Sequence, residues 1–111
     1  METDKKEKEN VLHCCEATGM FSTQEKISLV CSAIEKVLLT KNKNYGNSAL
    51  EPLRVFSNSS PEEAILVRLD DKLSRIKNSS ELRKNDCFDT LGYLVLLCVQ
   101  KGWIDFEELI D

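Results

Sequence analysis

Two short segments of the sequence bring acidic and basic residues to the spacing of a helix face. The first contains Arg68, Asp71, Lys72 and Arg75, and the second contains Asp86, Asp89, Thr90 and Tyr93. Intervals of three and four residues place side chains on one face of an α-helix. The second segment runs directly into an apolar stretch, and a carboxylate buried without a partner is strongly unfavourable. Its acids therefore require a cation, a metal ion or bound water nearby.

The acids of the two segments have the chemistry of a magnesium site. If the two helices return antiparallel, Asp71 approaches Asp86 and Asp89. Three converging carboxylates repel one another unless something neutralises them, and carboxylate and water oxygens are ligands that suit Mg²⁺ or Mn²⁺. The bases of the first segment are alternative partners for the same acids. A third interpretation is an exposed helix face on which neighbouring charges form ion pairs.

Helix signals in the first part of the sequence predict the elements that precede these segments. Residues 1–10 are charged, and we expect them to begin a first helix that reaches about Thr18. Ser22 and Glu25 have the spacing of a capping box, in which each side chain accepts a backbone N–H of the other residue. Apolar residues then recur at helical intervals to Leu38, which predicts an amphipathic helix.

The second part of the sequence carries equally clear helix boundaries. Ser60 and Pro61 have the residue types that begin a helix, as N-cap and first helical residue. A last long helix is expected over residues 81–101, where Gly102 ends it, and a short helix is expected within 103–110. We therefore predict a single domain of 111 residues, a compact all-α bundle of about four main helices with a short C-terminal helix.

Residues 40–60 break the helical pattern and predict a long loop. Loops of this length are uncommon in compact domains and are often functional. Lys43, Tyr45 and Asn47 lie in it beside a glycine, so the loop offers a cation, an aromatic ring and hydrogen-bond donors to an anionic ligand. The alternative is a solvated connector.

Composition limits the classes of partner. With 19 acids and 15 bases the net charge is −4, which does not favour binding to a nucleic acid polymer or to an anionic membrane. We find no apolar run of membrane-spanning length, and the charged opening does not resemble a secretory signal, so we expect a cytoplasmic protein. The apolar run at residues 94–99 is too extensive for one small domain to cover, which predicts a homo-oligomer, a dimer or a tetramer.

The five cysteines fit the same picture. Their number is odd and no two have the Cys-x-x-Cys spacing, so we interpret most of them as small core residues. His13, Cys14 and Cys15 form the one cluster that resembles zinc ligands, but no second pair accompanies it.

Three stretches together resemble a known family. They are Lys43-Asn44-Tyr45-Gly46-Asn47, then Arg68-Leu69-Asp70-Asp71-Lys72-Leu73-Ser74-Arg75, and then Asp86-Cys87-Phe88-Asp89-Thr90-Leu91-Gly92-Tyr93. Over residues 40–103 the chain resembles a phage and prophage family of small proteins that is similar to the MazG-like, all-α nucleotide pyrophosphatases. The resemblance implies a phage-infected or lysogenic bacterium as the setting.

The resemblance also implies a site. MazG-like enzymes hold Mg²⁺ with two acidic helix motifs and convert a nucleoside triphosphate to a monophosphate and pyrophosphate. It implies catalytic and metal-binding roles for Asp71, Asp86 and Asp89. Substrate binding would fall to Arg68, Lys72 and Arg75 at the phosphates, and to Lys43, Tyr45 and Asn47 at the base or sugar. The chain departs from the motifs where Arg68 replaces an expected glutamate and where Asp86 is shorter than one.

Two functional hypotheses and one alternative follow. The first is an Mg²⁺-dependent nucleoside triphosphate pyrophosphatase. The second is a non-catalytic nucleotide binder, such as a sponge that sequesters a cyclic or signalling nucleotide of host anti-phage immunity, and it needs no metal. The alternative is a helical interaction module whose charges only form ion pairs.

Overall fold

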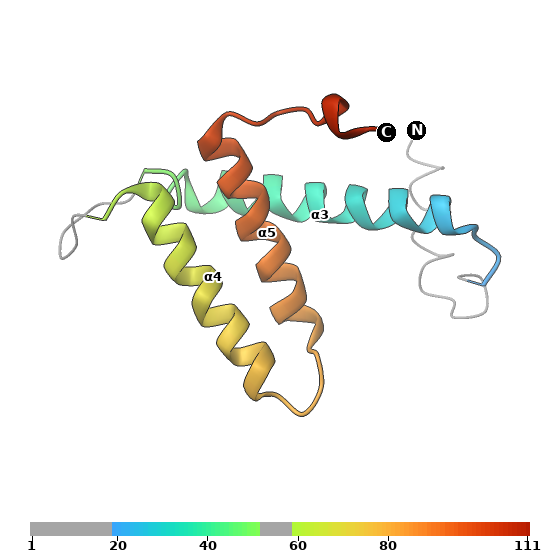
Figure 1. Ribbon diagram of the computed structural model, residues 1–111, viewed down its shortest axis with the longest axis horizontal. Helices are drawn as coiled ribbons and strands as arrows, with labels where there is room; N and C mark the ends of the chain where they lie inside the picture. The colour runs from blue at the N-terminus through green and yellow to red at the C-terminus, as the bar shows by residue number, and fades with distance from the viewer. Residues whose placement is uncertain (1–18, 52–58) are drawn as a thin grey trace. The chain divides into compact units, whose positions relative to one another are not determined.

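The computed structural model describes residues 19–51 and 59–111, and these residues form helices without any strand. In chain order the elements are α3 (Thr23–Tyr45), α4 (Pro61–Asn78), α5 (Lys84–Lys101) and a single 3-10 turn, η1 (Glu107–Leu109) (Figure 1). The predicted all-α class is confirmed. The helix expected before Thr18 lies outside the described residues, so the count of four main helices stays a prediction.

The chain divides into two compact units, Met1–Glu35 and Lys36–Asp111, and the boundary falls within α3. In the described part of the first unit, the predicted capping box is confirmed. The Ser22 backbone N–H donates to Glu25 Oε1 (3.3 Å), and the Glu25 backbone N–H donates to Ser22 Oγ (3.2 Å).

The end of α3 lies in the second unit and differs from the prediction. The helix continues to Tyr45, so the prediction of a loop from residue 40 is wrong for the first six residues. Polar residues without a proline or glycine can extend a helix on a solvent-exposed surface even when the apolar pattern stops. Gly46 ends the helix with a φ of 65°, a left-handed conformation that favours glycine.

Helix α4 begins as its sequence predicts. Ser60 is the N-cap, its hydroxyl accepts the backbone N–H of Glu63 (3.1 Å), and Pro61 occupies the first turn. The helix ends at Asn78, where the Ser79 hydroxyl donates to the carbonyl of Arg75 (2.6 Å). Because serine satisfies backbone groups at both ends, the boundaries of α4 are fixed locally.

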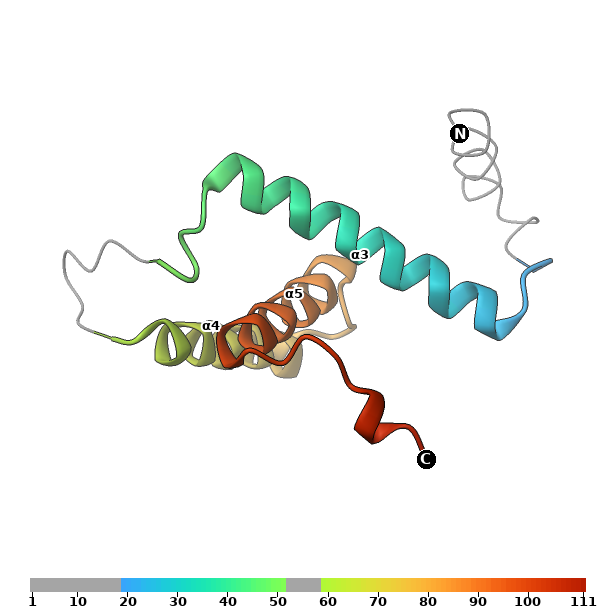
Figure 2. The same ribbon diagram turned by 90° about the horizontal axis from the view of Figure 1, so that it is seen from above.

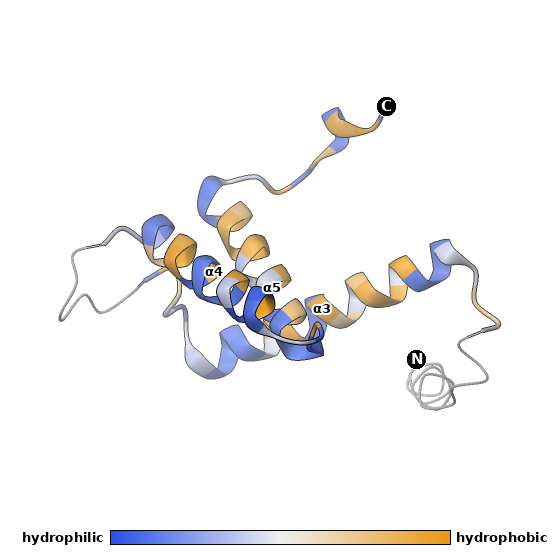
Figure 3. Cartoon of the chain, turned by 60° about the horizontal axis from the view of Figure 1, so that its bottom comes forward, coloured by the Kyte–Doolittle hydropathy of each residue, from blue (hydrophilic) through white to orange (hydrophobic). Residues whose placement is uncertain are grey.

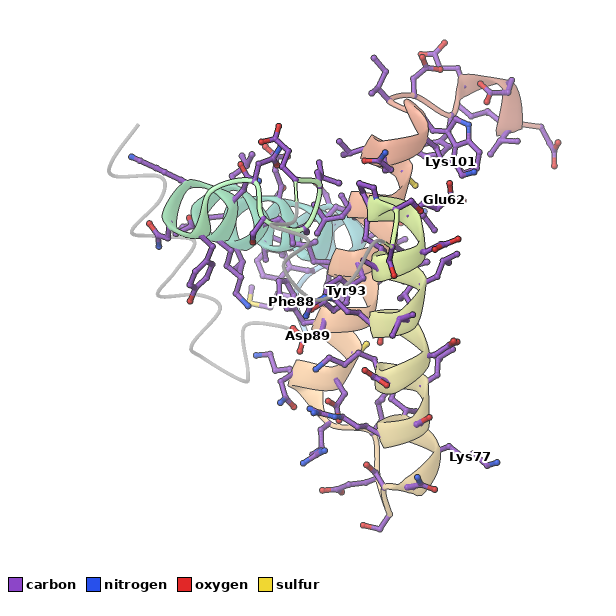
Figure 4. The ribbon with its side chains drawn as sticks, turned by 90° about the vertical axis from the view of Figure 1, so that its left-hand side faces the viewer. Glu62, Lys77, Phe88, Asp89, Tyr93 and Lys101 are labelled. Carbon is purple, nitrogen blue, oxygen red and sulfur yellow. The ribbon has the colours of Figure 1, made fainter. Side chains whose placement is uncertain are left out.

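Helices α4 and α5 form an antiparallel hairpin, and both ribbon views show them side by side (Figures 1 and 2). Ile65 and Leu69 of α4 are buried in it. At the open end of the hairpin, Lys101 Nζ lies 2.8 Å from Glu62 Oε1 (Figure 4). This ion pair and the buried side chains of Ile65 and Leu69 therefore hold the two helices in register.

The limits of α5 were predicted in part. It begins at Lys84, so the predicted start at Glu81 is wrong by three residues. Arg83 takes the N-cap position without a side-chain cap, because a guanidinium has no acceptor for backbone N–H groups, and its Nε donates to Asp86 Oδ2 (3.1 Å). Gly102 ends the helix as predicted, with a φ of 77°, and the Trp103 backbone N–H returns to the carbonyl of Cys98 (2.9 Å).

Removing the N-cap of α4 provides a test of this local account. We expect Ser60→Ala to lower the free energy of unfolding by about 1 kcal/mol, because the Glu63 N–H loses its acceptor. Ser74→Ala, an exposed serine in the middle of the same helix, is the matched control and should cause no loss. Urea denaturation followed by circular dichroism measures both. Equal losses in the two variants would contradict the assigned cap.

Candidate functional site

The acids of α5 each lie against a basic side chain of the hairpin. Asp89 is paired across the hairpin, and its Oδ2 lies 2.8 Å from Lys72 Nζ of α4. The side chains of Lys72 and Asp89 are only 15% and 27% exposed, so water screens this pair weakly. The ion pair therefore neutralises the Asp89 carboxylate where the two helices meet.

Asp86 is paired within its own helix turn. Its side chain is buried, its Oδ2 accepts a hydrogen bond from Arg83 Nε (3.1 Å), and the same oxygen forms an ion pair with Arg83 Nη2 (3.1 Å). The Thr90 hydroxyl donates to the Asp86 backbone carbonyl (2.8 Å). The other carboxylate oxygen, Oδ1, is buried without a hydrogen-bond partner. A negative charge in the first turn also interacts favourably with the helix dipole.

The third predicted acid does not join the other two. Asp71 is exposed on α4, and within residues 19–51 and 59–111 no group of three His, Cys, Asp or Glu side chains could hold a metal ion. In this part of the chain the acids of α5 instead lie against basic side chains, Asp89 against Lys72 and Asp86 against Arg83. Metal-binding and catalytic roles for Asp71, Asp86 and Asp89 stay predictions.

A pocket of about 160 Å³ opens between the end of α3, the turn that follows it, and α5. The turn and α3 contribute Lys41, Asn42, Tyr45 and Ser48, and α5 contributes Phe88, Asp89, Gly92 and Tyr93. Figure 4 shows that Phe88, Asp89 and Tyr93 all project from α5. The pocket thus combines aromatic rings, a cation, amide and hydroxyl groups, and the carboxylate that Lys72 neutralises.

Gly92 allows α5 to approach the end of α3 closely. A Cβ at this position would lie 3.1 Å from Leu38 Cδ2, tighter than ordinary van der Waals contact. Gly92 is buried, and it lies one helical turn after Phe88. The small residue therefore sets the separation of the two walls of the pocket.

Two basic groups lie over aromatic rings at the pocket. Lys41 Nζ is 5.2 Å from the centroid of the Phe88 ring, and the guanidinium carbon of Arg68 is 6.0 Å from the centroid of the Tyr93 ring. Both distances are within the range of cation–π attraction. Lys41 and Arg68 are otherwise exposed, so their charges remain available to an anion.

The structure brings together only part of the predicted substrate-binding set. Tyr45 lines the pocket and Arg68 contacts one of its rings, whereas Lys43 and Arg75 are exposed and do not line it. Lys72 is occupied by Asp89.

Asn47 stabilises the turn after α3. Its Oδ1 accepts a hydrogen bond from Asn42 Nδ2 (3.0 Å), its Nδ2 donates to Glu51 Oε1 (3.4 Å), and its backbone carbonyl accepts the N–H groups of Leu50 and Glu51. These contacts give Asn47 a structural role beside the pocket rather than a place in its wall.

Sequence reasoning missed Lys41, Asn42 and Phe88. A signal was present for two of them, because Lys41 and Asn42 lie four and three residues before Tyr45. On a continuous helix that spacing places Lys41 and Tyr45 on one face. This spacing was not recognised as helical, because residues 40–60 were expected to form a loop.

The chain has no match among family models, curated proteins or solved structures. None of the described helices is long and apolar enough to cross a membrane. The resemblance to MazG-like proteins therefore stays a prediction from three sequence stretches.

Breaking the Arg83–Asp86 pair tests its contribution to stability. We expect Arg83→Ala to lower the free energy of unfolding by about 3 kcal/mol, the low end for leaving a buried charge unpaired, since Arg83 itself is partly exposed. Lys84→Ala, the neighbouring exposed base, should change stability little. Chemical denaturation measures both, and a similar small effect in the two variants would show that Asp86 does not depend on Arg83.

Proposed function

We propose that the chain binds a nucleotide at the pocket beside α5 and does not hydrolyse it. The observation that carries the proposal is the 2.8 Å contact between Lys72 and Asp89. A carboxylate held by an internal cation is a poor metal ligand, because a metal would have to displace that cation. It remains able to accept hydrogen bonds from the N–H groups of a base.

The lining supports a ligand with an aromatic part and an anionic part. Tyr45, Phe88 and Tyr93 present rings on which a base can stack, and stacking contributes about 1–3 kcal/mol per base. Lys41 and Arg68 lie at these rings with exposed charges that suit phosphate oxygens. This combination favours a nucleotide over a purely apolar ligand.

The size of the pocket indicates which part of the ligand it takes. Its volume of about 160 Å³ is below the roughly 300–1,000 Å³ of ordinary ligand pockets. One nucleobase fits such a volume. The sugar and phosphates would then extend along the exposed basic side chains at the rim, Lys41 and Arg68. The resemblance to phage proteins adds a cyclic or signalling nucleotide of host immunity as the class to test first.

A metal-dependent pyrophosphatase is the second candidate, and one observation favours it. Asp86 Oδ1 is buried without a hydrogen-bond partner, and Asp86 and Asp89 share a helix face. A free carboxylate oxygen has the chemistry of a magnesium ligand. This function requires Lys72 and Arg83 to move away from the two carboxylates or to contact phosphate instead.

One experiment separates the two candidates. Purified protein is incubated with nucleoside triphosphates and cyclic nucleotides, with and without Mg²⁺. The nucleotides that stay free in solution and those that heat denaturation releases from the protein are then chromatographed separately. If the protein binds a nucleotide without hydrolysing it, an intact nucleotide should be depleted from solution equally with and without Mg²⁺. Monophosphate and pyrophosphate formed only with Mg²⁺ would contradict it and support the pyrophosphatase, and no retention of any probe would contradict the binder.

A pair of lysine variants tests where the nucleotide binds. We expect Lys41→Gln to weaken binding about tenfold, because a charged contact of this kind contributes about 1.4 kcal/mol. Lys43→Gln is the matched control, an exposed lysine on the same helix that does not line the pocket. Isothermal titration with the retained nucleotide measures both. A larger loss in Lys43→Gln would place the ligand outside this pocket.

A further inference from the structure

Asp89 gives the pocket a carboxylate that a nucleobase can contact. It is the only charged residue that α5, described over its whole length, contributes to the pocket wall, beside Phe88, Gly92, Tyr93 and Leu96. Figure 3 shows that α5 is hydrophobic over most of its second half, so few polar groups of this helix compete with Asp89 for a ligand. Asp89 is therefore the group of α5 that can select a base by hydrogen bonds.

The ion pair between Lys72 and Asp89 leaves part of this carboxylate for a ligand. Lys72 Nζ contacts Oδ2 (2.8 Å), whereas a carboxylate has about four acceptor sites on its two oxygens. The same contact holds the Asp89 side chain in one position before a ligand arrives. A carboxylate paired with a cation only accepts hydrogen bonds, so the base that it contacts must supply the donors.

The common bases differ in what they present to a carboxylate. Guanine has two adjacent donors on one edge, N1–H and the N2 amino group, and a single carboxylate can accept from both. Adenine and cytosine each place one amino group beside a ring nitrogen that is an acceptor, and a carboxylate repels that nitrogen. Uracil and thymine place one N–H between two carbonyl oxygens. A carboxylate at the edge of the base therefore favours guanine.

The asparagine in the pocket wall does not offer adenine an equivalent contact. An asparagine amide reads adenine when it donates and accepts at the same edge of the base. Asn42 lines the pocket, but its Nδ2 already donates to Asn47 Oδ1 (3.0 Å). This amide is therefore engaged in holding the turn after α3.

We propose that the pocket selects guanine, and that Asp89 accepts the N1–H and N2 amino hydrogens of the base. The inference rests on the proposed nucleotide binding and names the base that the pocket takes. The charges around the pocket give such a ligand one orientation. Lys41 and Arg68 are exposed beside the rings of the pocket, whereas a phosphate directed at Asp89 would meet a carboxylate. The base therefore enters toward Asp89, and the phosphates stay near the two basic side chains.

Isothermal titration of the full wild-type chain with the 5′-monophosphates of guanosine, inosine and adenosine tests the inference. Inosine monophosphate differs from guanosine monophosphate only by the missing N2 amino group. We expect it to bind about tenfold more weakly, because one hydrogen bond to a charged acceptor is lost. Adenosine monophosphate should bind more weakly still.

The outcomes of this titration separate the inference from the proposed function. Equal affinities for guanosine and inosine monophosphates, or tighter binding of adenosine monophosphate, would overturn the selection of guanine and leave nucleotide binding standing. Failure of all three probes to bind would overturn both.

Asp89→Asn adds a test that a folding defect cannot imitate. The new amide would accept N1–H and donate to the 2-oxo group that xanthine carries in place of the guanine amino group. We expect this variant to bind xanthosine 5′-monophosphate more tightly than guanosine 5′-monophosphate, the reverse of the wild-type order. Asp70→Asn is the matched control, an exposed aspartate of α4 that does not line the pocket, and should keep the preference for guanine. A preference for guanine that persists in Asp89→Asn, or that is lost in Asp70→Asn, would show that Asp89 does not read the base.

Discussion

The ion pair between Lys72 and Asp89 is the interaction on which the candidate site depends. It joins the two helices of the hairpin at the level of the pocket, and both side chains are largely withdrawn from water. In such surroundings each charge requires the other, because removal of either leaves a poorly solvated ion. The pair therefore fixes the position of α5 against α4 and decides the chemistry of Asp89, which becomes a neutralised hydrogen-bond acceptor.

Much of the fold could be predicted from local sequence. The capping box at Ser22, the N-cap at Ser60 and the stop at Gly102 are confirmed, because each depends on hydrogen bonds within a few residues. The predicted end of α3 and the predicted start of α5 were wrong. At both places an exposed, mainly polar segment lacks an apolar pattern, so periodicity does not locate the boundary, which Gly46 sets at the end of α3.

The candidate site was predicted less well, for a physical reason. Helical spacing shows which residues share a face, but it does not show which charges on two packed helices pair with one another. The sequence placed Asp71, Asp86 and Asp89 around one metal ion, whereas the structure pairs Asp86 with Arg83, three residues away, and Asp89 with Lys72. The bases of the first segment, Lys72 among them, were one of the alternatives that the residue types allowed, whereas a partner at Arg83 was not considered.

Gly92 also determines how the pocket can adapt. Where this residue meets the side chain of Leu38, the wall on α5 is backbone, which has no rotamers to change. The long side chains of Lys41 and Tyr45, by contrast, are exposed and free to rearrange. The pocket would therefore discriminate between ligands by shape at its rigid wall beside Gly92. It would accept different substituents at its opening, beside Lys41 and Tyr45.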